Sequence, residues 1–236
     1  MKEDYLKFYS PSLEQETEML VFGESGKPVI LFPTSMGRFF QNKDFKLIDT
    51  VAEQLDSGKI KIYCPDSIDE QSWYNKLIQP KDRVLNHLKY DNYIMNEVVP
   101  KALEETGSDK IIFAGCSFGA YHATNFGFKY PEITSHILNM GGAFDVKMHL
   151  RGYYDDNVYF NNPPDFVPNL EDDDIYKLNI VLGVGGDDFC LEDNLKMSKI
   201  LDDKRIVHWL DVREGKDHDW PVWRSMFPEY IKKIVG

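Results

Sequence analysis

One serine of the chain lies in a setting that suits a nucleophile. Ser117 occupies the segment Gly115-Cys116-Ser117-Phe118-Gly119, which follows the apolar run 111–114 and opens a helical pattern that ends before Pro131. A strand, a sharp turn bearing a serine and a helix together form a nucleophile elbow. Side chains at the two glycine positions would collide with the adjoining strand and helix, which explains the glycines. The alternative is a glycine-rich turn that merely packs well.

A serine hydroxyl attacks efficiently when a neighbouring imidazole takes its proton. We predict that His218 is this base, because it follows the last predicted strand in the glycine-containing loop Gly215–Trp220. The alternative for His218 is a histidine at a helix start that bonds to backbone. The other histidines lie in predicted helices, inside a strand or beside an irregular segment: His87, His122, His136, His149 and His208.

The imidazole in turn needs an acid that holds its tautomer and stabilises its charge. Asp187 and Asp188 follow the apolar strand pattern 180–184, and we prefer Asp188. Asp211 is a weaker third choice because it lies at the end of the next strand. The chain order of serine, aspartate and histidine is that of the α/β-hydrolases.

Negative charge on the substrate oxygen requires hydrogen-bond donors. The residue after the nucleophile supplies one backbone N–H, which here belongs to Phe118. The second should come from the loop after an early strand, Pro33–Gly37. We choose the Ser35 N–H, with Met36 as the close alternative.

The elements that must position these residues follow from hydrophobic periodicity. We expect strands at 18–23, 29–32, 60–64, 111–114, 137–140, 180–184 and 205–210. We expect helices at about 45–55, 81–105 with an interruption near Pro100, the segment before Pro131, 191–201 and 220–235. Strands that alternate with helices predict a mostly parallel sheet with helices on both faces, and the two earliest strands, separated by a turn, suggest an antiparallel start.

The periodic pattern fails between residues 143 and 176, where Asp, Asn, Pro and aromatic residues are frequent. A long irregular insertion in an α/β domain is often a lid or a binding loop. We expect Trp73, Tyr74 and Tyr153, with the rest of this insertion, to wall the substrate pocket. The alternative is a solvated excursion.

The bulk composition narrows the classes of function. A length of 236 residues suits a single domain, 1–236, and a net charge of −12 disfavours binding to nucleic acid or to anionic membranes. The acidic runs are most simply solvated loops. Three cysteines do not form a disulfide framework, and the polar N-terminal segment does not resemble a signal peptide, so we expect a cytoplasmic protein. The sequence leaves the oligomeric state open, and a homo-oligomer is one possibility.

The chain resembles the bacterial esterases of the esterase D-like branch of the α/β-hydrolases, nearly from end to end. The segments that carry the resemblance are Phe32–Phe40, Asp66-Ser67 with Ser72–Asn75, Gly115–His122, Gly152–Pro163 and His218–Trp223. Pro33-Thr34 stands where many α/β-hydrolases have His-Gly, which leaves the early oxyanion donor open.

This resemblance implies an α/β-hydrolase fold and a triad of Ser117, Asp188 and His218 that works without a metal or another cofactor. The expected activity is hydrolysis of a small-molecule carboxylic ester through an acyl-enzyme. Two alternatives stay open: an acyltransferase or thioesterase with the same triad, and a non-catalytic ligand-binding or scaffold protein that keeps the fold.

Overall fold

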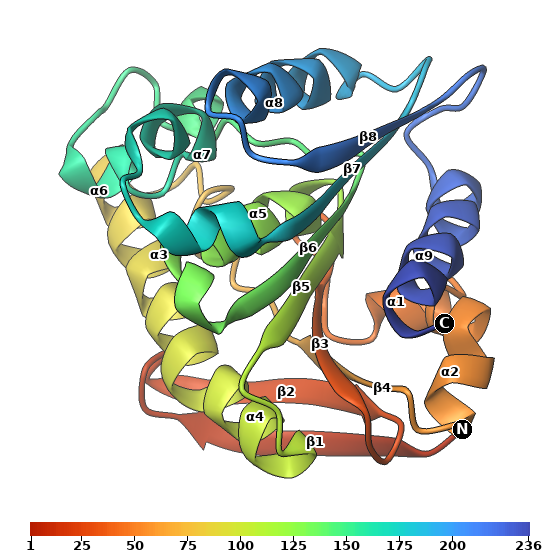
Figure 1. Ribbon diagram of the computed structural model, residues 1–236. Coiled ribbons are helices and arrows are strands. Elements are labelled where there is room, and N and C mark those ends of the chain that lie inside the picture. The colour runs from red at the N-terminus through yellow and green to blue at the C-terminus, as the bar shows by residue number, and fades with distance from the viewer.

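A twisted eight-stranded sheet runs through the centre of the computed structural model, which describes residues 1–236 (Figure 1). The strand order is β1-β2-β4-β3-β5-β6-β7-β8. The strands are β1 (Glu3–Ser10), β2 (Gln15–Phe22), β3 (Lys27–Phe32), β4 (Ile60–Pro65), β5 (Ile111–Cys116), β6 (Thr134–Met140), β7 (Asn179–Gly185) and β8 (His208–Arg213). The pairs β1–β2 and β2–β4 are antiparallel, and the other pairs are parallel.

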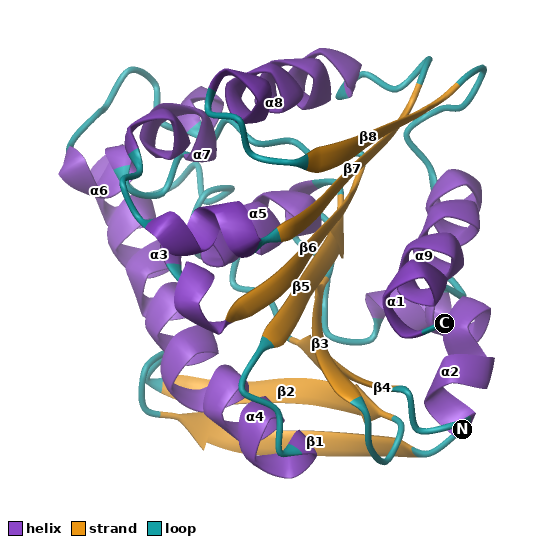
Figure 2. Cartoon of the chain, viewed as in Figure 1, coloured by secondary structure: helices purple, strands orange, loops and turns teal.

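Helices cover both faces of this sheet (Figure 2). They are α1 (Gln41–Asp44), α2 (Ala52–Asp56), α3 (Pro80–Tyr93), α4 (Val99–Thr106), α5 (Phe118–Lys129), α6 (Asp156–Tyr159), α7 (Pro163–Phe166), α8 (Leu191–Asp203) and α9 (Trp220–Val235). Figure 1 shows α1, α2 and α9 on one face, and α3, α4, α5 and α8 on the other. The predicted fold class, a mostly parallel sheet with helices on both faces, is therefore confirmed.

The strand β5 shows how the sequence builds two cores from one sheet. Its side chains alternate between faces, so Ile111 and Phe113 join the cluster under α3 and α5, whereas Ile112 and Ala114 join the cluster under α9. Because both faces are covered, every residue of β5 is buried. This burial fixes the end of β5, which Ser117 follows.

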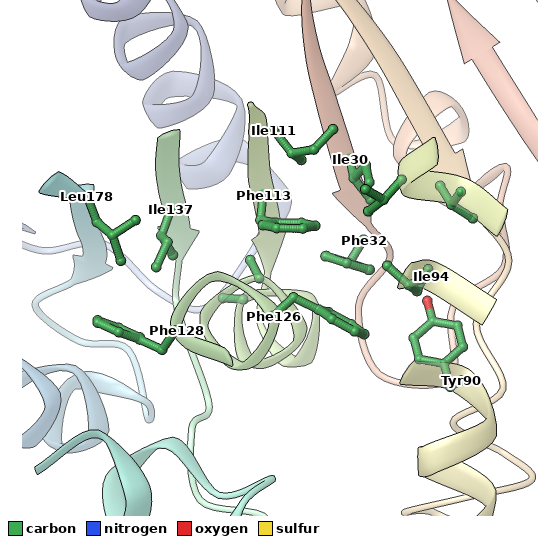
Figure 3. Close-up of a cluster of buried hydrophobic side chains, with 14 of the residues drawn as sticks. Ile30, Phe32, Tyr90, Ile94, Ile111, Phe113, Phe126, Phe128, Ile137 and Leu178 are labelled. Carbon is green, nitrogen blue, oxygen red and sulfur yellow. The ribbon is translucent and has the colours of Figure 1, made fainter. Parts of the chain in front are cut away.

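Stacked aromatic rings lie among the aliphatic side chains of the cluster beneath α5 (Figure 3). The ring of Phe126 on α5 stacks on Phe32 of β3 at 5.4 Å between centroids and on Phe113 of β5 at 5.9 Å. Aromatic pairs at such separations add to the stability that burial alone supplies. The helix after Ser117 is thus held firmly against the two strands beneath it.

Three predicted elements differ from the structure. The antiparallel start is present, but the pair is β1–β2, and β4 separates β2 from β3. The helix expected at 45–55 begins later, because Lys46 has a left-handed φ of 63°. It consists of the 3₁₀ turn Ile48–Val51 followed by α2. The strand expected at 205–210 is shifted to His208–Arg213, since Arg205, with a φ of 61°, still belongs to the turn that ends α8.

The interruption predicted near Pro100 is a widened turn and not a break. Between α3 and α4 the chain forms a π-helical turn, Ile94–Val98, and Pro100 sits in the first turn of α4. A proline has no N–H and its ring crowds the preceding turn, which a wider turn relieves.

The insertion between residues 143 and 176 is ordered and anchored. It consists of short helical segments, including α6 and α7, that lie over α3 and α5. The Asn162 side chain accepts a hydrogen bond from the Val146 N–H at 2.8 Å, and Asn161 bonds the buried imidazole of His87 at 3.1 Å. The insertion is therefore part of the folded domain and not a solvated excursion.

Two histidines with lowered pKa values should make the protein less stable in mild acid. Burial lowers the pKa of His87 well below its usual value and that of His136 to about 4. The unfolded chain binds protons at these groups from about pH 6.5 downward while the folded chain does not, so stability is present above that pH and is lost below it. We expect a loss on the order of 1 kcal/mol per histidine between pH 7 and pH 5.

Thermal unfolding at both pH values measures this loss. The variant His136→Gln should show a smaller difference between the two melting temperatures than the wild type. Equal melting temperatures of the wild type at pH 7 and pH 5 would contradict the expectation.

Candidate active site

The turn at Ser117 has the strained backbone of an elbow. Ser117 has φ 56° and ψ −120°, a conformation that side-chain-bearing residues rarely adopt. A Cβ added at Gly115 would lie 2.2 Å from the Gly119 carbonyl carbon, and one added at Gly119 would lie 2.5 Å from the Pro33 carbonyl oxygen. The two glycines therefore permit the close approach of β5, α5 and the loop after β3, as the sequence predicted.

Gly119→Ala tests this close approach. An alanine in a helix is normally favoured over glycine by about 1 kcal/mol, but here its methyl group would press on backbone atoms that cannot move away. We expect a net loss of about 1–3 kcal/mol in the free energy of unfolding, together with reduced activity, because the loop after β3 shifts. Chemical denaturation and ester hydrolysis measure the two effects. A variant as stable and as active as the wild type would contradict the steric account.

Three side chains from separate loops meet at the carboxyl ends of the parallel strands. The Ser117 Oγ lies 2.8 Å from Nε2 of His218, and Nδ1 of His218 lies 2.8 Å from Oδ1 of Asp188. Ser117 follows β5, Asp188 follows β7 and His218 follows β8. This chain of hydrogen bonds can pass the serine proton to the imidazole while the carboxylate stabilises the imidazolium.

The structure separates the three candidates for the acid. Asp188 is buried, and its Oδ1 also accepts a hydrogen bond from the Cys190 N–H at 2.7 Å, which fixes the carboxylate toward His218. Asp187 is exposed. Asp211 lies within β8 and binds the Tyr230 hydroxyl and Arg213, so it serves the packing of α9.

Aromatic rings hold the imidazole of His218 on two sides. Phe189 lies 4.1 Å from it between ring centroids, and Trp223 meets it edge-on at 5.0 Å. Gly141, at the end of β6, leaves room for the hydrogen-bonded side chains of Asp188 and His218, since a Cβ there would lie 3.0 Å from Asp188 Oδ2. Sequence reasoning did not assign these residues to the site, although Phe189 directly follows Asp188 and Trp223 lies in the segment that carries the family resemblance.

The group Asp188, Cys190 and His218 is the one cluster whose ligand atoms lie close enough to hold a metal ion, all within 4.8 Å of one another. The ligand atoms of Asp188 and His218 already bond each other. Burial, with the charge of Asp188, raises the pKa of the Cys190 thiol to about 12, which disfavours the thiolate that binds metals. The donor set fits a hydrogen-bonded acid–base pair better than a metal site.

Two backbone N–H groups near Ser117 are free to bind an oxyanion. Phe118 is the first residue of α5, so its N–H has no partner within the helix. The Ser35 N–H makes no hydrogen bond to the protein, whereas the Met36 N–H lies 3.4 Å from Oδ2 of Asp69. Of the two candidates in this loop, Ser35 has the available donor.

Tyr74, together with the hydrogen-bonded pair Asp69 and His122, fixes the loop after β3. The Tyr74 hydroxyl donates a hydrogen bond to the Ser35 Oγ at 2.8 Å, and its ring packs edge-on against Phe118 at 5.1 Å between centroids. Asp69, whose carboxylate faces Met36, also bonds the buried imidazole of His122 at 2.9 Å. His122 therefore acts in the support of the loop and not as the base.

The three residues expected to wall the pocket take different positions. Tyr74 lines an open pocket beside the elbow. Trp73 is fully buried and packs against His87 at 4.8 Å between ring centroids, so the prediction that its ring contacts substrate needs correction: it supports the wall from behind. Tyr153 packs against the same small core as Tyr74 and bonds Asp155, outside the residues that line the pocket.

Solved structures of esterases and other hydrolases share this fold. A ferulic acid esterase matches with a TM-score of 0.81 and 17% identity, over 99% of this chain and 97% of its own. An S-formylglutathione hydrolase from Agrobacterium tumefaciens matches at 0.78 and 13%, over 99% and 95%. The fluorophosphonate-binding serine hydrolase F of Staphylococcus aureus matches at 0.70 and 16%, over 100% and 98%. At these identities the similarity establishes the fold, which is that of the α/β-hydrolases.

No family model matches the sequence. No curated protein matches it either. None of the helices is both long enough and apolar enough to cross a membrane.

Proposed function

We propose that this α/β-hydrolase-fold protein is a serine hydrolase that cleaves small-molecule carboxylic esters through an acyl-enzyme. The observation that supports this most is the hydrogen-bonded series from Ser117 through His218 to Asp188, with the serine on a strained turn. A turn of that conformation costs stability, on the order of 1–3 kcal/mol, and such strain is found where function requires it.

In the first half-reaction the Ser117 Oγ attacks the ester carbonyl carbon and its proton passes to Nε2 of His218. The carbonyl oxygen becomes an oxyanion, which the N–H groups of Phe118 and Ser35 bind. When the tetrahedral intermediate collapses, the bond to the alcohol oxygen breaks, and that oxygen takes the proton from His218. The alcohol leaves and the acyl group stays on Ser117.

In the second half-reaction a water molecule gives its proton to His218 as its oxygen attacks the acyl carbon. Collapse of this intermediate breaks the bond to the Ser117 oxygen, which recovers the proton from His218, and the carboxylic acid leaves. Throughout, Asp188 Oδ1 accepts the hydrogen bond from Nδ1–H of His218, so that Nε2 faces the serine. Each oxyanion donor lowers the barrier by about 3 kcal/mol.

The competing activities differ in what removes the acyl group. An acyltransferase would pass it to an alcohol, amine or thiol, and a thioesterase would begin from a thioester. A binding protein would form no acyl-enzyme. Short-chain 4-nitrophenyl esters and the matching thioesters, incubated with the protein and analysed with and without added alcohols and amines, separate these cases: we expect free acid as the main product and faster cleavage of the oxygen ester. Transfer to the added nucleophile as the main product, or no turnover of any ester, would overturn the hydrolase assignment.

A further inference from the structure

A positively charged pocket lies beside the elbow. It encloses about 410 Å³, and we call it the cationic pocket. The residues that line it are Tyr74, Lys76, Arg83, Met148, His149 and Arg151. Two come from the segment before α3, one from α3 and three from the insertion. No local sequence pattern unites them, since they are spread over residues 74 to 151 and meet through the packing of the insertion on α3.

The charges of this pocket are unbalanced. The chain carries a net charge of −12, yet none of Lys76, Arg83 and Arg151 makes an ion pair with a carboxylate. Lysines on the same elements do have partners: Lys89 of α3 pairs with Glu14, and Lys147 of the insertion pairs with Asp165. The chain thus leaves three cations together without a counter-ion in one hollow.

Arg83 is the strongest sign that an anion belongs there. Its side chain is 1% exposed, and the guanidinium donates to two carbonyl oxygens, those of His149 and Ile78. A guanidinium has five N–H donors, and the buried Nε of Arg83 has no partner. Burial and the charge of Arg151 lower the pKa of Arg83, which expresses how costly an uncompensated buried cation is.

The carboxylate of Asp69 lies near the cationic pocket but does not pair with any of its three cations. Asp69 influences His149 electrostatically, but its oxygens bond His122 and face the Met36 N–H. Burial lowers the pKa of His149, so its imidazole is neutral at pH 7 and offers a hydrogen bond but no charge. The positive charge of the pocket therefore comes from the three cations.

Two residues that line the cationic pocket also contact the elbow. The rings of Tyr74 and His149 pack against Phe118, the residue after Ser117, at 5.1 Å and 5.6 Å between centroids. The Tyr74 hydroxyl also bonds the Ser35 Oγ, in the loop after β3. The cationic pocket therefore adjoins the residue that follows Ser117, and we take the group bound there to be part of the substrate.

We propose that the substrate carries a carboxylate, which the cationic pocket binds through Arg83, Arg151 and Lys76 while Ser117 attacks the ester. A planar carboxylate matches the fork of a guanidinium and would use the free donors of Arg83. The inference rests on the proposed ester hydrolysis and narrows it to acidic esters.

Paired substrates that differ in charge test the proposal. On the acyl side, the 4-nitrophenyl ester of adipic acid is compared with the 4-nitrophenyl ester of monomethyl adipate. On the alcohol side, 4-acetoxybenzoate is compared with 4-acetoxybenzamide. The quantity measured is the ratio of kcat/KM for the acidic ester to kcat/KM for its neutral partner. We expect this ratio to exceed about 10 in at least one pair at low salt, and to fall as added salt screens the charges.

Variants assign the preference to the pocket. The double variant Lys76→Gln/Arg151→Gln changes exposed side chains and should fold normally; it should lower the ratio at least about tenfold, through the KM of the acidic ester. Lys232→Gln, an exposed lysine on α9, is the matched control and should leave the ratio unchanged. Arg83→Met adds a third measurement if it folds, since it removes the buried cation.

The outcomes separate this inference from the proposed function. A ratio near 1 in both pairs, or a ratio that the double variant leaves unchanged, overturns the carboxylate assignment, while turnover of the neutral esters still supports ester hydrolysis. Failure to cleave any of the four esters counts against both the hydrolase and the inference. The pair with the larger ratio shows whether the carboxylate lies on the acyl or on the alcohol side.

Discussion

Ser117→Ala should lower kcat for ester hydrolysis by about 10⁴- to 10⁶-fold, to the small residual rate that substrate binding and the oxyanion donors support by themselves. The reason is that the variant keeps the imidazole and the oxyanion donors but has no oxygen that can form the acyl-enzyme. Substrate affinity should change little, because the cationic pocket and the backbone donors stay in place. Initial rates with a short-chain 4-nitrophenyl ester measure the loss.

A second serine offers a matched control for this experiment. Ser198 on α8 also hydrogen-bonds a histidine, with its Oγ 2.7 Å from Nε2 of His208, but it lies on a helix and not on an elbow. Ser198→Ala should keep kcat within about twofold of the wild type. Both variants should retain the wild-type circular dichroism. A Ser117→Ala protein that is folded and fully active would remove Ser117 from the reaction.

Asp188→Asn should lower kcat by about 10⁴-fold with the fold intact. An asparagine amide at this position donates a hydrogen bond to Nδ1 of His218, which turns the imidazole into the tautomer whose Nε2 carries a proton. That nitrogen then cannot accept the proton of Ser117. The carboxylate that stabilises the imidazolium is lost as well. Rates across pH, with KM determined separately, measure the effect on catalysis alone.

The neighbouring aspartate is the control for charge and position. Asp187 is adjacent in sequence but exposed, so Asp187→Asn should leave kcat within about twofold. The two variants lose the same charge at almost the same place, and their difference isolates the bond to His218. Equal losses in both variants, or a larger loss in Asp187→Asn, would contradict the assignment of Asp188.

Most of the strand positions and the elbow could be predicted because their signals are local. The run from Ile111 to Gly119 contains its own strand, turn and helix start, and the loops that hold Asp188 and His218 each follow an apolar strand pattern. Parallel strands present such loops at one edge of the sheet, so the sequence suffices to predict that the three side chains lie near one another.

Other features depend on packing that no local pattern records. Trp73 and Tyr74 are adjacent aromatic residues, but one is fully buried and the other faces the pocket. Ile206 alternates like a strand residue, yet it is buried where the chain leaves α8 and before β8 begins. Arg83 and Arg151 meet in the cationic pocket because the insertion folds back on α3. Nothing in the sequence of α3 indicates that Arg83 is buried, so this pocket could not be predicted.

The most direct test of the account is the site of reaction with a fluorophosphonate probe. Such a probe forms a stable bond with a serine that a neighbouring imidazole activates, and an unactivated serine reacts far more slowly. Intact mass spectrometry of the treated protein should show one adduct, peptide mapping should place it on Ser117, and both Ser117→Ala and His218→Ala should stay unmodified. An unlabelled wild-type protein, or an adduct on a different serine, would contradict the claim that Ser117 is the nucleophile of this site.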